Sequence, residues 1–202
     1  MVHTIERAKG RRSDRPTTRE RVFEAAVREF SRTGMADADI GAIASAAGVS
    51  RGTFYFHFPT KEHALAELTR HEEALIADEL TDALTSTVDL KSALAEVIRR
   101  VVAEEARLGH MLFRDVLSLY FSATQPELRE SDTHPVALIV IRQIEMARDR
   151  GEIYSEVEPG YSGVFFLIGL YGLLLTNQDR APARTVALEK YLASFYRGLE
   201  VR

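Results

Sequence analysis

Apolar residues recur three or four positions apart along almost the whole chain, which is the period of a helix with one buried face. Prolines and glycines interrupt this pattern and divide it into segments. Residues 136–141 (VALIVI) would also suit a buried strand, but their continuation into RQIEMARDRG favours a helix, and no partner strand is evident. The sequence therefore predicts an all-α fold of about nine helices. They cover about residues 17–33, 40–47, 51–57, 61–84, 90–108, 110–123, 135–150, 159–178 and 182–199.

The segment 40–61, IGAIASAAGVSRGTFYFHFPTK, has the pattern of a helix-turn-helix. Asp39 can cap its first helix, and Gly48 suits the left-handed conformation that ends a helix and turns the chain. Ser50 can then cap a second helix over 51–57. A helix this short is not stable alone, so its neighbours must hold it in place. The pattern is typical of proteins that place the second helix in the major groove of DNA.

This segment resembles the DNA-binding domain of the TetR family of bacterial transcriptional regulators. The family's run is similar to AxxAGVSxGTxYxHFxxKxxL, and residues 44–61 read ASAAGVSRGTFYFHFPTK, followed by Leu65. The main departure is Asp39, where the family usually has Ser or Thr, and this exchange keeps a capping side chain. Beyond residue 65 the resemblance is one of architecture. It implies a DNA-binding domain of three helices over 1–60, with a basic arm at 1–16, and a helical effector-binding and dimerisation domain over 61–202.

The exposed side of the short second helix carries the candidate groups for reading bases. The Arg51 guanidinium can bond guanine in bidentate fashion, and Thr53 can contact a thymine methyl group or a phosphate. Gly52 is a poor helix former, which suggests a place where another molecule approaches the backbone closely. The residues predicted to contact DNA are Ser50, Arg51, Gly52, Thr53, Tyr55, His57 and Lys61.

Three of these groups are better suited to phosphates, which position a protein on DNA without specifying sequence. Tyr55 and His57 lie near the end of the short helix. Lys61 lies in the first turn of the next one, where its ammonium and the backbone N–H groups can hold a phosphate together. The alternative for all three is an ordinary solvated face. The interleaved Phe54, Phe56 and Phe58 are expected to be buried core.

Charge is distributed unevenly along the 202 residues, whose formal net charge is −4. Residues 1–62 hold 11 basic and 8 acidic side chains, a net of +3, whereas residues 63–202 hold 15 and 22, a net of −7. DNA binding depends on the local patch, so this asymmetry fits a DNA-facing N-terminal part. The arm can follow phosphates, enter the minor groove or stay a solvated tail. Its cations are Arg7, Lys9, Arg11, Arg12 and Arg15.

The last two predicted helices indicate a second subunit. Residues 159–178 are apolar on nearly every side, and a soluble helix of this kind must be covered all round. Residues 182–199 present one apolar stripe, and Gly169 and Gly172 allow another helix to approach closely. The core of one subunit could absorb all this surface, but a homodimer through 159–178 and 182–199 is the simpler explanation. The resemblance implies the same arrangement, a four-helix bundle made by the last two helices of each subunit.

The middle of the chain carries more apolar surface than a small bundle needs to fill itself, which suits a cavity for a small-molecule effector. Few polar side chains are available there to orient a ligand, so the effector is expected to be largely apolar and weakly charged. The candidate effector-binding residues are Val101, His110, Met111, Phe113, Arg114, Leu117, Tyr120, Phe121, Ile139, Gln143 and Phe165.

Other kinds of site find little support in the sequence. The chain has no cysteine, so it has no disulfide, thiol nucleophile or thiolate metal site. His63, Glu67 and His71 have the spacing of metal ligands on one helical face, but that face lies opposite the apolar stripe and is expected to be plain solvated surface. We expect no metal, no cofactor and no catalytic residue. A polar N-terminus and a longest apolar run of 12 residues, 164–175, predict a cytoplasmic protein outside the membrane.

The expected function is that of a ligand-responsive transcriptional regulator, usually a repressor in the family that the chain resembles. It would bind a palindromic double-stranded DNA operator as a homodimer and leave when an effector enters the helical body. Two alternatives stay open. An architectural DNA-binding protein would share the helix-turn-helix and need no cavity. A helical-bundle enzyme or metal carrier would need inward-facing carboxylate and histidine pairs, and the sequence has no Glu-x-x-His.

Overall fold

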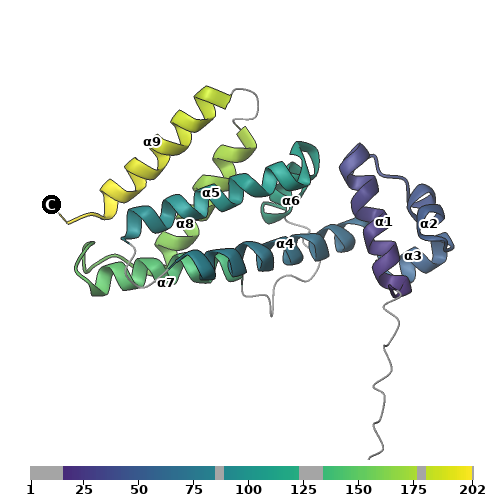
Figure 1. Ribbon diagram of the computed structural model, residues 1–202, viewed down its shortest axis with the longest axis horizontal. Coiled ribbons are helices and arrows are strands. Elements are labelled where there is room, and N and C mark those ends of the chain that lie inside the picture. Colours follow the sequence, from purple (N-terminus) through teal and green to yellow (C-terminus); the bar gives the residue numbers. More distant parts are fainter. Residues whose placement is uncertain (1–15, 85–88, 123–133, 177–180, 202) are drawn as a thin grey trace, which may run out of the picture.

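The computed structural model describes residues 16–84, 89–122, 134–176 and 181–201, and these are mostly helical (Figure 1). The predicted all-α class is confirmed. The predicted arm, residue 123 and residues 177–178 lie outside the described residues. The helices are α1 (Thr18–Thr33), α2 (Ile40–Ala47), α3 (Arg51–His57), α4 (Lys61–Ala83), α5 (Leu90–Leu108), α6 (His110–Tyr120), α7 (Pro135–Asp149), α8 (Pro159–Thr176) and α9 (Ala181–Leu199).

Side-chain caps explain where several helices begin. At α1 the Glu20 N–H donates to the Thr17 hydroxyl and the Thr17 N–H donates to the Glu20 carboxylate, 3.2 and 2.6 Å apart. Asp89 caps α5 by accepting from the Ser92 N–H at 2.9 Å. Thr60 precedes α4 but makes no side-chain cap bond. Its hydroxyl lies 3.0 Å from Nδ1 of His63.

The helices form two connected parts, which we call the head (α1–α3) and the body (α4–α9). Figure 1 shows the head at one end of the molecule, with α4 running from it into the body. Helix α4 packs against α5 and α7, and α7 packs in turn against α8. Helix α4 is one continuous helix of 23 residues and so joins the head directly to the body.

Two apolar cores lie along this arrangement. The head core contains Phe30, Ile43 and Phe54, and it extends onto Leu65 and Leu68 of α4. The body core is built mainly from α5, α7 and α8, with α4 and α6 contributing at its edges. Its fully buried side chains include Leu94, Val97, Val140, Ile144, Phe166 and Leu170.

Helix α6 belongs to both cores. Phe113 and Leu117 face the body core, whereas three other side chains of the same helix lie in the head core: Leu112, Val116 and Leu119. A polar contact reinforces the second attachment, because the Asp115 carboxylate accepts from the Met35 N–H at 2.6 Å. Met35 lies in the loop between α1 and α2. Helix α6 therefore fixes the head to the body from a second side, separate from α4.

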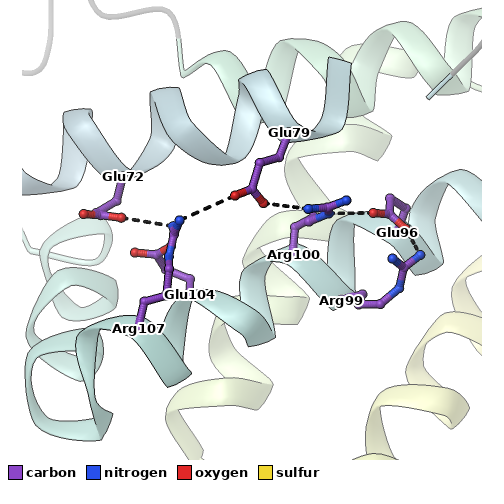
Figure 2. A network of polar contacts seen from close by, with 7 residues as sticks. All are labelled: Glu72, Glu79, Glu96, Arg99, Arg100, Glu104 and Arg107. Carbon is purple, nitrogen blue, oxygen red and sulfur yellow. Dashed lines mark hydrogen bonds and ion pairs between the residues drawn. The ribbon is translucent and has the colours of Figure 1, made fainter. Parts of the chain in front are cut away.

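A network of ion pairs joins α4 to α5 (Figure 2). Arg107 of α5 reaches both Glu72 and Glu79 of α4, at 3.1 and 3.5 Å. Arg100 bonds Glu79 at 2.8 Å and Glu96 at 2.6 Å. The Glu104 side chain, only 3% exposed, pairs with Arg107, and Glu96 is 8% exposed. Carboxylates this buried require partners, because an unpaired charge in the interior is strongly destabilising.

Because α6 also packs into the head core, we expect one substitution on this helix to destabilise the protein. Leu112→Ala removes a body side chain that is 1% exposed within the head core. We expect the free energy of unfolding in urea to fall by about 2–5 kcal/mol, since the substitution leaves a cavity. Leu138→Ala on α7, where the side chain is 50% exposed, is the control and should cost far less. Equal effects from the two substitutions would contradict the shared core.

Candidate DNA interface and effector pocket

The turn between α2 and α3 has the geometry that the sequence predicts. Asp39 accepts from the Ala42 N–H at 2.9 Å and so caps α2. Gly48 has φ 67° and ψ 39°, the left-handed conformation that ends this helix. The Ser50 hydroxyl accepts from the Thr53 N–H at 3.1 Å and starts α3. These local bonds end α2, turn the chain and begin α3.

Two aromatic anchors hold α3 against the head. Phe54 is fully buried and Phe58 is 1% exposed, with their ring centres 6.0 Å apart. The Arg19 guanidinium lies over the Phe58 ring, 5.0 Å from its centre. The opposite side of α3 faces solvent, and its exposed residues are Arg51, Gly52, Tyr55 and Phe56, with Thr53 and His57 at the margins.

Phe56 corrects the expectation that all three phenylalanines of this segment are core. Its side chain is 82% exposed. Phe54 and Phe58 are four residues apart and share one face of the helix, whereas Phe56 is two residues from each and points away from both. Its ring meets His57 edge-on, 5.1 Å between centres. Phe56 therefore adds a large apolar group to the solvent face of α3, a feature that helical spacing alone would have identified.

Arg51 rests beside the start of α2. One of its guanidinium nitrogens is 3.9 Å from the Asp39 carboxylate, and the two side chains are 70% and 63% exposed. Hydrogen bonds from the Ala42 and Gly41 N–H groups lower the pKa of Asp39, with a smaller contribution from Arg51. An ion pair this exposed is weak. The guanidinium is therefore able to exchange this partner for another at little cost.

Lys61 has a structural contact that the sequence did not suggest. Its ammonium donates to the carbonyl oxygens of Ala36 and Ala38, at 2.7 and 3.3 Å. It therefore ties the start of α4 to the loop between α1 and α2. This contact spans more than 20 residues of sequence, which explains why spacing within the motif gives no sign of it.

The histidines and carboxylate spaced like metal ligands on α4 have other partners or stay apart. Glu67 accepts two bonds from Arg19 of the head, one of them 2.6 Å long. His63 contacts Thr60, and His71 is exposed. Over the described ranges, no cluster of three His or carboxylate side chains has an arrangement that could hold a metal ion.

Two cavities in the described part of the body bear on the predicted effector site. One, of about 240 Å³, lies between α4 and α7 and is lined by Leu80, Thr81, Leu84, Ile139, Arg142, Gln143 and Met146. The other, of about 190 Å³, lies between α6, α7 and α8. We call it the aromatic pocket, and its lining is Tyr120, Phe121, His134, Ala137, Val164, Leu167, Ile168 and Tyr171.

The structure does not bring the predicted effector residues together in one place. Tyr120 and Phe121 line the aromatic pocket, whereas Ile139 and Gln143 line the cavity beside α4. Val101, Phe113 and Leu117 are buried in the body core. The remaining four point elsewhere: His110 toward Glu105 at 2.9 Å, Met111 toward Gly34 of the head, Arg114 to solvent and Phe165, 63% exposed, to the outside of α8.

Sequence reasoning missed the residues that complete the aromatic pocket on α7 and α8. His134 stands immediately before the proline that starts α7, and Tyr171 is one polar group within a long apolar helix. A buried carboxylate behind them, Glu73 of α4, is 6% exposed. An acidic residue on the apolar side of α4 is the signal in the sequence that could have located this site.

Comparison with known proteins agrees with this geometry. Residues 22–68 match the family described as bacterial regulatory proteins, tetR family. The probable HTH-type transcriptional regulator ArpR of Pseudomonas putida is 30% identical over 177 residues, which cover 80% of this chain and 82% of that protein. The HTH-type transcriptional regulator AcrR of Shigella flexneri is 36% identical over 95 residues, 45% of this chain and 44% of that protein, so this match spans less than half of the relative.

A solved structure is similar in fold over nearly the whole chain. It is Thermus thermophilus FadR, a TetR family transcriptional repressor in complex with lauroyl-CoA. The TM-score is 0.71 at 24% sequence identity, and the match covers 91% of this chain and 96% of the other. The helix-turn-helix, the helical body and the long match to ArpR together identify the protein as a member of the tetR family of bacterial regulatory proteins.

Proposed function

We propose that this protein is a ligand-responsive transcriptional repressor of the cytoplasm. It binds a palindromic operator as a homodimer and is released when a small effector enters the body. The observation that carries the proposal is the solvent face of α3, where Arg51, Tyr55 and Phe56 are exposed while Phe54 and Phe58 anchor the helix from behind. A short helix held in this way is suited to the major groove.

Each group on this face suits a different part of DNA. Arg51 leaves Asp39 and bonds a guanine edge, and Thr53 contacts a thymine methyl group or a phosphate. Ser50, at the start of the helix, and Gly52, with nothing bulky in front of it, let the backbone come close to the duplex. Tyr55 and His57 reach phosphates.

Lys61 contributes to the same interface in two ways. An ammonium has three N–H donors, and two of them point to the Ala36 and Ala38 carbonyls. The third is available for a phosphate. Lys61 thus holds the loop that precedes α2 and adds a charge beside the groove.

The partner in the dimer covers the outer side of α8. Helix α8 has a mean hydropathy of 1.4 over its 18 residues, and by length and composition it could cross a membrane, but 39% of it is buried within the protomer. The exposed remainder forms a stripe at helical spacing, Tyr161, Val164, Phe165 and Ile168, and the half-buried Gly172 continues it. A helix packed into a water-soluble core on one side is better covered by a second copy than by lipid, and a DNA-binding head requires water around it.

The two glycines of α8 support this arrangement differently. A side chain at Gly169 would meet the Tyr191 ring of α9 within the same protomer, 2.6 Å from the hydroxyl oxygen. At Gly172, apart from the adjacent residues and the backbone of α8 itself, no atom of the described protomer lies within 4 Å of that position. The close approach at Gly169 is thus intramolecular, while Gly172 leaves room for a helix of the partner.

Helix α6 connects the effector pocket to the head. Tyr120 and Phe121, at its end, line the aromatic pocket, and Leu112, Val116 and Asp115 contact the head. A ligand that displaces Tyr120 moves this helix, and the head moves with it. In the dimer such a movement changes the distance between the two α3 helices, and operator half-sites accept only one distance.

We expect Arg51→Ala to relax the preference for one base pair in each half-site by about 1–3 kcal/mol. Selection of operators from a random DNA library, followed by titration of the consensus and its single-base variants, measures this. Arg150→Ala, which removes an exposed cation of the body, is the control. Thr53→Val tests the second reader in the same way. An unchanged consensus from both head variants would remove these residues as base readers.

Lys61→Met keeps the length of the side chain and removes its ammonium. We expect the free energy of unfolding to fall by about 1.5–3 kcal/mol without any DNA, because bonds from a charged donor are lost. On DNA, the plot of log K against log salt should flatten by about 2 per dimer. Lys91→Met, on an exposed position of α5, controls for general loss of charge. An unaltered slope would leave Lys61 with its structural role alone.

Gly172→Leu should convert the dimer into a folded monomer. Leucine fits within the protomer, where the space is open, but it blocks the approach of a partner helix. Light scattering after size exclusion measures the mass, and circular dichroism checks that the helices persist. Ala74→Leu adds similar bulk to an exposed position on α4 and should leave the dimer intact. A dimeric Gly172→Leu protein would place the interface elsewhere.

A further inference from the structure

The aromatic pocket is walled by rings on one side. Tyr120 contributes the central ring, whose centre is 5.0 Å from that of Tyr171 and 5.7 Å from that of His134. Phe121, 49% exposed, adds a fourth ring at the rim. The other wall is aliphatic. None of the described residues that line the pocket is a lysine or an arginine.

A carboxylate lies directly behind the rings. Both oxygens of Glu73 are 3.2 Å from Nδ1 of His134, and its side chain is 8% exposed. Burial, the neighbouring Tyr171 and hydrogen bonding to Glu73 raise the pKa of Tyr120 well above its ordinary value. Burial and the charge of Glu73 likewise raise the pKa of Tyr171. The two phenols therefore stay protonated, and the acidic group beside them is the Glu73 carboxylate, which also contacts His134.

We propose that the aromatic pocket binds a compact organic cation, such as a quaternary ammonium group on an apolar frame. The faces of aromatic rings attract cations, and this attraction grows when water is excluded. The buried carboxylate adds a longer-range attraction that acts in the same direction. The identification of this cation as the effector rests on the proposed function, but its binding does not.

The same features disfavour an anionic ligand. A carboxylate or phosphate placed here would face Glu73 across the rings, and no lysine or arginine among the described lining residues compensates for it. The volume of about 190 Å³ also suits a compact group better than a long chain with a nucleotide. The ligand therefore differs in charge and size from the lauroyl-CoA bound to the similar FadR fold.

A matched set of three probes tests the charge preference. Phenyltrimethylammonium and tert-butylbenzene have nearly the same shape and differ by one positive charge, and 4-tert-butylbenzoate carries a negative one. Calorimetric titration of the full chain without DNA should show the cation binding about tenfold more tightly than the neutral probe. The benzoate should bind more weakly than either. Equal affinity for the three, tighter binding of the benzoate or no binding of the cation would overturn the proposal.

Variants then locate the preference. Glu73→Gln should reduce the affinity for phenyltrimethylammonium about tenfold and leave that for tert-butylbenzene nearly unchanged. Asp78→Asn removes an equal charge from an exposed position of the same helix and should change neither. Phe121→Leu alters only the half-exposed rim, so it keeps the test valid if Glu73→Gln does not fold. Phe121→Leu should lower the affinity for the cation severalfold and leave the affinity for tert-butylbenzene unchanged. A cation affinity unchanged in Phe121→Leu would exclude this pocket.

Operator binding separates this inference from the proposed function. If the cation binds as described but leaves operator affinity unchanged, the pocket assignment holds and the effector role fails. If instead the benzoate or the neutral probe releases the operator while the cation does not bind, regulation by a ligand holds and the charge preference is wrong.

Discussion

The burial of α6 in two cores is the constraint on which the architecture depends. A helix of 11 residues supplies Phe113 and Leu117 to the body and Leu112, Val116 and Leu119 to the head. Interiors are close-packed, so neither core can move relative to α6 without repacking. The head is thus attached to the body by the continuous α4 and by α6. The head can therefore change its position relative to the body only if α4 or α6 moves or repacks.

The ion pairs between α4 and α5 determine how α4, the first attachment of the head, can move. The side chains of Glu96 and Glu104 are almost completely buried. Their burial is favourable only while Arg99, Arg100 and Arg107 form ion pairs with them. Sliding α4 along α5 would separate Glu72 and Glu79 from the same arginines. We therefore expect α4 and α5 to move together. The link from α6 to the head is different in kind, because it is made mainly of apolar contacts together with the bond from Met35 to Asp115.

The sequence predicted well what depends on near neighbours. The caps at Asp39 and Ser50 and the turn at Gly48 each involve residues within a few positions, so their chemistry can be read along the chain. Phe56 shows the limit of treating aromatic residues alike, since helical angle separates it from Phe54 and Phe58. The carbonyl partners of Lys61 and the pocket around Glu73 arise from segments that meet only after folding. That is why the predicted effector residues are dispersed over two cavities, the core and the surface.

The exposed stripe of α8 also bears on how the protein is made. Ribosomes release the head and helices α4 to α7 before residues 161–172 emerge, and domains begin to fold during synthesis. The stripe therefore appears on a scaffold that is already largely built, and in the proposed homodimer it is solvent-exposed only until a second copy binds. In a cell that holds few copies, this search is slow, and chaperones or proteases compete for the apolar face in the meantime. If the homodimer is the active form, as proposed, the supply of active protein rises more steeply than the rate of translation, since pairing depends on the square of the concentration of free protomers.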